Sequence, residues 1–102
     1  MDKEENFYVY LFRDPVTDEP VYVGKGQGNR AISHTWTKAR TNDRLGKLIA
    51  ARSSEGHSVE PEVIAKSSEQ NALLMEQALI RFFGRADLGQ GPLFNNTDGG
   101  DG

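Results

Sequence analysis

Residues 6–24 read NFYVYLFRDPVTDEPVYVG and decide the fold of this chain. The stretch from Asn6 to Phe12 is rich in aromatic and β-branched residues, and so is the stretch from Pro20 to Gly24. Such residues favour β-strands. The connection DPVTDEP between them is rich in turn-forming residues. We therefore predict a β-hairpin whose two strands are joined by a loop of several residues.

Helical patterns follow the hairpin. The glycines of GKGQGN (residues 24–29) are expected to end the second strand and to lead into a helix over Arg30–Arg40. A second helix is predicted to begin with Asn42 or Asp43 as its cap and to end before Gly56. Its apolar face consists of Leu45, Leu48 and Ile49.

The second half of the chain predicts one more strand and one more helix. Val59–Ala65 has strand composition, and Pro61 within it favours an edge position, because proline cannot donate to a strand ladder. Ser67 is predicted to cap the last helix, with Gln70 as its capping-box partner and Gly84 just past its end. The tail that follows is rich in Gly, Asp and Asn, and we expect it to be irregular.

The order β-β-α-α-β-α predicts an α+β fold, with a small three-stranded, mainly antiparallel sheet flanked by helices. The 102 residues suit a single domain over residues 1–102. With no cysteine, disulfides, thiolate zinc sites and a cysteine nucleophile are excluded. No apolar run is long enough to span a bilayer and the acidic start differs from a signal peptide, so we expect an intracellular domain, cytoplasmic or nucleoid-associated.

The charge distribution indicates a polyanion-binding surface. The formal net charge is −3, yet residues 25–52 hold seven basic side chains and a single acidic one, Asp43. A block this basic on an acidic domain predicts contact with phosphates, although any one of its residues is also explained as a solvated helix position. The basic residues are Lys25, Arg30, Lys38, Arg40, Arg44, Lys47 and Arg52.

Glu76 is the most informative single residue. It lies four residues after Ala72 and three before Leu79, so helical periodicity places it in or beside an apolar stripe. A carboxylate there is costly unless it is paired or binds a metal. A glutamate at the edge of the stripe that reaches water or pairs with Arg30 explains the pattern equally well.

Other patterns are weaker when each is taken alone. The run GKGQGNR matches neither common glycine-rich phosphate loop, and a flexible turn is the simpler interpretation. Arg30 and His34 share a helix face, but His34 by itself is an ordinary surface histidine. Tyr8 and Tyr10 share a sheet face, and Tyr22 lies across the hairpin in a register that the sequence leaves open.

Taken together, these residues resemble the GIY-YIG nuclease family. Tyr8-Val9-Tyr10 stands where the family has Gly-Ile-Tyr, and Tyr22-Val23-Gly24 stands where it has Tyr-Ile-Gly, with eleven residues between the two tyrosines. Lys25, Arg30-x-x-x-His34, Glu76 and the final LFNNTDGG (residues 93–100) match further family positions in order. The resemblance covers residues 7–100. It looks closest to the branch that includes ankyrin/LEM-domain nucleases and bacterial and phage relatives.

Two positions depart from the family pattern. Tyr8 replaces the first glycine, a common kind of variation that leaves Tyr10 in place. The gap from Gly24 to Arg30 is short compared with the family pattern.

The resemblance implies an endonuclease that hydrolyses phosphodiester bonds in DNA, in repair or recombination, with one divalent cation. Glu76 would hold that Mg²⁺ or Mn²⁺ ion, and Arg30 would stabilise the phosphorane. Tyr10, together with Tyr22, would act as general base or orient the attacking water. Because a free tyrosine has a pKa of about 10, a base needs a lowered pKa, and Lys25 and the metal are the expected sources.

Two further roles come from the same resemblance. His34 would bond a tyrosine or shuttle a proton, and Asn95 would anchor the C-terminal segment against the site or against a phosphate. The basic residues that would contact nucleic acid are Lys25, Arg30, Lys38, Arg40, Arg44 and Lys47. DNA is the favoured partner over RNA. The alternative is an inactive nucleic-acid-binding or protein-interaction module on the same fold.

Overall fold

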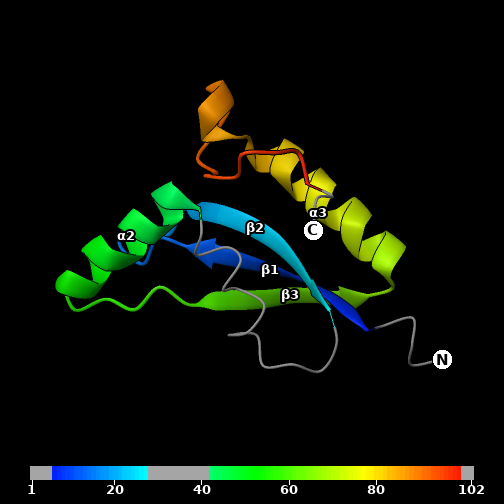
Figure 1. Ribbon diagram of the computed structural model, residues 1–102, viewed down its shortest axis with the longest axis horizontal. Helices are drawn as coiled ribbons and strands as arrows, with labels where there is room; N and C mark the ends of the chain where they lie inside the picture. The colour runs from blue at the N-terminus through cyan, green and yellow to red at the C-terminus, as the bar shows by residue number, and fades with distance from the viewer. Residues whose placement is uncertain (1–5, 28–41, 100–102) are drawn as a thin grey trace.

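The computed structural model describes residues 6–27 and 42–99, which form a three-stranded antiparallel sheet with two long helices (Figure 1). The elements in chain order are β1 (Phe7–Arg13), β2 (Pro20–Gln27), α2 (Asp43–Ser54), β3 (Pro61–Ser67), α3 (Glu69–Phe83) and the 3₁₀ turn η3 (Ala86–Leu88). The strand order β2-β1-β3 makes β1 the central strand. The predicted α+β class is confirmed, while the helix predicted over Arg30–Arg40 lies outside the described residues.

The hairpin has the predicted strands, but β2 is longer than expected. It continues through Lys25 to Gln27, because Gly24 pairs with Tyr10 and Gly26 pairs with Tyr8 across the ladder. The expectation that these glycines end the strand is therefore wrong. With Gly24–Gln27 in a strand, this half of the GKGQGNR run does not form a phosphate-binding loop.

Each face of the sheet has its own core, because side chains alternate along β1. The core on one face, called the tyrosine cluster below, buries Tyr8, Tyr10, Phe12, Val21, Leu45 and Val59. The core on the other face buries Val9, Leu11, Val23, Ala72, Ile80 and Leu93. The first set includes a residue of α2 and the second includes residues of α3. The two helices therefore bury apolar area against different cores.

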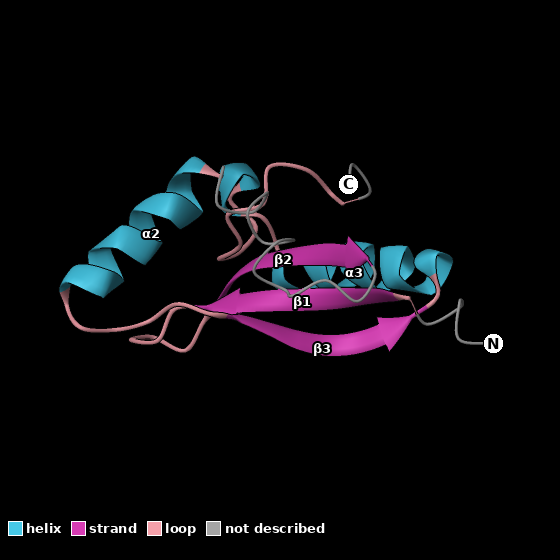
Figure 2. Cartoon of the chain, turned by 60° about the horizontal axis from the view of Figure 1, so that its bottom comes forward, coloured by secondary structure: helices cyan, strands magenta, loops and turns pink. Residues whose placement is uncertain are grey.

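The helices are separated in space as these cores require. Figure 2 shows α3 lying against one face of the sheet, while α2 extends beyond the end of the strands. The α2 bounds and its Asn42 cap agree with the prediction, since the Asn42 Oδ1 accepts the backbone N–H of Leu45 at 3.0 Å. No helix within residues 6–27 and 42–99 has the length and apolar character needed to cross a membrane.

Three boundaries predicted near the third strand shift by one or two residues. The strand begins at Pro61, on the sheet edge as expected, and runs to Ser67. The predicted Ser67 cap is therefore wrong: Ser68 caps α3, and its Oγ accepts the backbone N–H of Asn71. Ser67 and Ser68 are equally suitable as helix caps by residue type. Because Ser67 pairs with Phe7 in the sheet, it belongs to β3 and Ser68 becomes the cap.

A buried ion pair joins α2 to the connection between β1 and β2. Arg52 donates from Nε and from an Nη atom to the two carboxylate oxygens of Asp14, both at 2.8 Å. Asp14 is 6% exposed and also accepts the backbone N–H of Val16. Arg52 belongs to the basic block, but its guanidinium is occupied by Asp14. The hydrogen bonds from Arg52 lower the pKa of Asp14 to about 2.

We expect Asp14→Asn to lower the melting temperature at pH 7 by about 5–10 °C, because asparagine keeps the Val16 contact and loses the charge. A lowered carboxyl pKa stabilises the fold above the ordinary value of 3.8, and that stabilisation disappears as the pH falls through 2. Thermal unfolding from pH 7 to pH 2 should show the two proteins converging below pH 4. Asp43→Asn is the control, because Asp43 pairs with Lys47 in solvent. A gap that persists unchanged at pH 2 would contradict this account.

Candidate functional site

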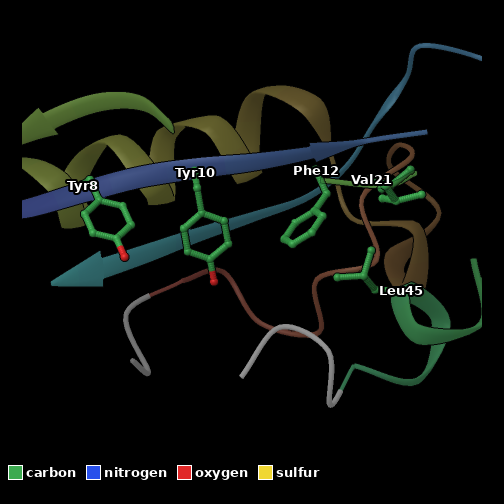
Figure 3. Packing of buried hydrophobic residues seen from close by; sticks show 6 residues of the cluster. Tyr8, Tyr10, Phe12, Val21 and Leu45 are labelled. Carbon is green, nitrogen blue, oxygen red and sulfur yellow. The ribbon is translucent and has the colours of Figure 1, made fainter. Parts of the chain in front are cut away.

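A row of aromatic rings crosses β2 on the tyrosine-cluster face. Figure 3 shows Tyr8, Tyr10 and Phe12 projecting from the same side of β1 across the neighbouring strand. The rings of Tyr8 and Tyr10 lie 6.3 Å apart, and those of Tyr10 and Phe12 lie 5.9 Å apart. The prediction that the two tyrosines of β1 share one face is confirmed.

The two glycines of β2 make this arrangement possible. A Cβ atom added at Gly24 would lie 2.3 Å from Cζ of Tyr10, and one added at Gly26 would lie 2.4 Å from Cζ of Tyr8. The tyrosine rings therefore occupy the space of the missing side chains. As a result, both phenols pass over β2 and reach toward its outer edge.

Tyr22 joins the same face of the hairpin. It pairs with Phe12 across the ladder, and their ring centroids are 6.3 Å apart in an edge-to-face arrangement. Tyr22 is half-buried, and its phenol contributes to the pKa shift of Tyr10. The sequence left this register open. In the structure, Tyr22 lies two residues before Gly24, the glycine that the Tyr10 ring covers.

Glu76 is buried in α3, as its position in the apolar stripe predicted. It is 9% exposed and lies between Ala72 and Ile80 on the buried side of the helix. The helix covers the face of the sheet opposite the tyrosine rings. Even so, the carboxylate lies close enough to Tyr10 for its charge to raise the pKa of the phenol. The charge of Glu76 therefore acts on the phenol of Tyr10, although α3 covers the opposite face of the sheet.

The pKa of Tyr10 is raised, which is the opposite of what a general base needs. Burial is the main cause, and the neighbouring Tyr22, Glu76 and Tyr8 add to it. Tyr10 is therefore a neutral phenol at pH 7 and can donate a hydrogen bond.

Lys25 does not supply the expected opposing charge from the face of Tyr10. It pairs with Val9 in the ladder, which places it on the α3 face, and its Nζ lies 5.5 Å from the centre of the Phe7 ring. The sequence interpretation placed Lys25 near Tyr10 because the two are close along the hairpin. Alternation along β2 puts them on opposite faces.

Asn95 anchors the C-terminal segment, defined here as Leu93–Gly99, to β2. Its Oδ1 accepts the Val23 N–H at 3.0 Å and its Nδ2 donates to the Val23 carbonyl at 2.8 Å. The side chain is 5% exposed, so both polar ends are used inside the protein. Of the two roles expected for Asn95, the structure matches anchoring and not direct binding of a phosphate.

The neighbouring residues extend this attachment. The Phe94 N–H donates to the carbonyl of Val21 at 2.6 Å, and the Phe94 carbonyl accepts from Nδ2 of Asn42 at 2.8 Å. At the far end, Gly99 lies against Glu76: an added Cβ would be 3.3 Å from the carboxyl carbon. The segment therefore runs from the cap of α2, along β2, to the buried carboxylate.

Only part of the predicted basic surface is described. Arg44 and Lys47 are exposed on α2, and the Arg44 guanidinium lies 5.2 Å from the centre of the Phe94 ring. Lys47 pairs with Asp43 at 3.2 Å in solvent. Three further residues predicted for this surface, Arg30, Lys38 and Arg40, lie outside the described ranges, and so does His34, which was predicted as a catalytic residue.

Glu76 fits the chemistry of a weakly held divalent cation. Within the described ranges, no group of three His, Cys, Asp or Glu side chains is placed to hold a metal. Magnesium is commonly bound by one or two carboxylates and keeps several waters, so a single buried carboxylate beside phenols suits it. A closed structural metal centre would need more protein ligands.

The structure adds residues that sequence reasoning missed. Gly24 and Gly26 shape the tyrosine face, and their spacing of two residues matches the spacing of Tyr8 and Tyr10. That match was visible in the sequence, but using it required the strand register. The role of Gly99 beside Glu76 had no comparable signal, because the two residues are distant in the chain.

Comparisons with known proteins identify no relative. No protein-family model, curated protein or solved structure matches this chain.

Proposed function

We propose that this chain is a metal-dependent endonuclease of the GIY-YIG type that hydrolyses phosphodiester bonds in DNA. The observation that carries the proposal is the buried carboxylate of Glu76, whose charge acts on the buried phenol of Tyr10. Glu76 lies on the apolar side of α3, where a carboxylate costs free energy unless it is paired or binds a cation. Such costs are typical of sites where the groups do chemistry.

The buried acid also favours catalysis over simple binding. A carboxylate beside the phosphates of DNA is repulsive unless a cation lies between them. A binding module would gain affinity by replacing Glu76 with a neutral residue. Glu76 would hold the cation, which supplies positive charge to the phosphate and makes a bound water more acidic.

The phenols would orient the reacting groups. Because its pKa is raised, Tyr10 keeps its proton at neutral pH and donates a hydrogen bond to the attacking water or to a phosphate oxygen. Of the two roles expected for Tyr10, this favours orientation over general-base catalysis. Tyr22 lies on the same face and would assist it.

Two residues from the family resemblance complete the proposal. Arg30 would stabilise the phosphorane through its guanidinium, and His34 would bond a tyrosine or carry a proton. Around them, Arg44 and Lys47 are exposed for phosphate contacts, and Lys38 and Arg40 are assigned to the same surface, whereas Lys25 would contact phosphates from the α3 face. We place the reaction inside the cell, on DNA undergoing repair or recombination.

The test is a cleavage panel on linear, flapped, four-way-junction and supercoiled DNA and on RNA, with Mg²⁺, with Mn²⁺ and with EDTA. We expect cleavage of at least one DNA form with either metal and none with EDTA. Binding should also weaken steeply as salt rises, because the basic surface contacts phosphates. Salt-sensitive binding without cleavage would indicate the inactive nucleic-acid-binding module instead. Absence of both would indicate a protein-interaction module.

A further inference from the structure

Arg85 contacts both halves of the C-terminal segment. It follows Gly84, the residue that ends α3, and it forms a parallel bridge with Leu93. The backbone N–H of Ala86 donates to the Leu93 carbonyl at 2.7 Å, and the Leu93 N–H donates to the Gly84 carbonyl at 3.0 Å. Leu93, the first residue of the C-terminal segment, is thereby bonded to Gly84 and Ala86 on either side of Arg85.

The side chain of Arg85 reaches the far half of the same segment. Its Nη1 donates to Asp98 at 2.8 Å, and its Nη2 donates to the carbonyl of Asn96 at 2.7 Å. Asp87 holds the other side of the guanidinium through two bonds of 2.9 and 2.7 Å. The Arg85 side chain is only 13% exposed. A planar, forked donor can satisfy these acceptors together, whereas a lysine ammonium cannot match this geometry.

These contacts have a consequence for the candidate site. The bonds of Asn95 fix only the first half of the segment, whereas Gly99 lies against Glu76 at the other end. Between them, Arg85 supplies side-chain bonds to Asn96 and Asp98. We propose that Arg85 is a positioning residue, whose guanidinium holds the C-terminal segment so that Gly99 stays against Glu76. The catalytic part of this inference depends on the proposed nuclease function.

The test compares Arg85→Ala and Arg85→Lys with Arg81→Ala. Arg81 is an exposed arginine in the last turn of α3, so its removal changes the charge equally. We expect Arg85→Ala to lower the cleavage rate at saturating DNA by about 10- to 100-fold, because small misplacements at a site are costly. The affinity for DNA should change less than about twofold, because Arg85 is occupied by Asp87 and Asp98. Arg85→Lys should recover only part of the rate, and Arg81→Ala should resemble the wild type.

A second readout does not depend on cleavage. In ¹⁵N relaxation measurements, the amides of Thr97 and Gly99 should become mobile in Arg85→Ala, while the Val23 amide stays protected by Asn95. If Gly99 stays as rigid as in the wild type, or if it becomes mobile without loss of rate, the inference is overturned. If the wild type cuts no substrate, the proposed function fails, and relaxation then decides whether Arg85 holds the segment.

Discussion

We expect Glu76→Gln to lose at least about 100-fold in DNA cleavage while it keeps most of its DNA affinity, since the change removes the carboxylate charge that would hold the cation. Glutamine has nearly the same shape as glutamate, so packing against Ala72 and Ile80 is preserved. Single-turnover cleavage with Mg²⁺, together with Mn²⁺ titration, measures the loss.

Glu69→Gln provides the matched control. Glu69 is an exposed glutamate at the start of the same helix, so the charge change is equal and the site is untouched. The control variant should cleave DNA and bind Mn²⁺ like the wild type. Equal cleavage by Glu76→Gln and the wild type would show that the site is assigned to the wrong residue.

Gly24→Ala is expected to have the second large effect, because the new methyl group would coincide with the Tyr10 ring. The added Cβ would lie 2.3 Å from Cζ and 2.4 Å from the hydroxyl oxygen. Either β2 or the ring must move, which should lower the free energy of unfolding by about 1–3 kcal/mol. Cleavage should fall by at least about 10-fold, because the phenol leaves its place. Urea unfolding and near-ultraviolet circular dichroism measure the two consequences.

The origin of this effect can be tested by a double-mutant cycle with Tyr10→Leu, which lacks both colliding atoms. In that background Gly24→Ala should cost much less, so that the coupling free energy exceeds about 1 kcal/mol. An equal cost in both backgrounds would mean that the ring does not occupy the space above Gly24.

Much of the fold could be predicted, because its signals are local. Aromatic and β-branched runs predicted the hairpin, and the Asn42 cap predicted where α2 begins. Errors occurred where local signals were ambiguous. Ser67 and Ser68 are equivalent as caps, and glycines usually interrupt strands, whereas Gly24 and Gly26 continue β2 because tyrosine rings cover them.

The candidate site was only partly predictable. Helical periodicity placed Glu76 on the apolar side of α3, and its burial is confirmed. The electrostatic effect of Glu76 on Tyr10 could not follow from periodicity, because it depends on how α3 crosses the sheet. Lys25 is close to the hairpin tyrosines in sequence, but its side chain lies on the α3 face of the sheet, opposite their rings.

The sequence by itself determined the hairpin, α2, β3 and α3, the side of α3 that carries Glu76 and the spacing of the tyrosines, because each follows from backbone periodicity and local capping. Tertiary structure alone decided the neighbours of each group. Bonds between distant residues attach Asn95 to Val23 and Arg85 to Asp98, and burial raises the pKa of Tyr10. Such contacts depend on helix packing and strand register, which no local pattern encodes.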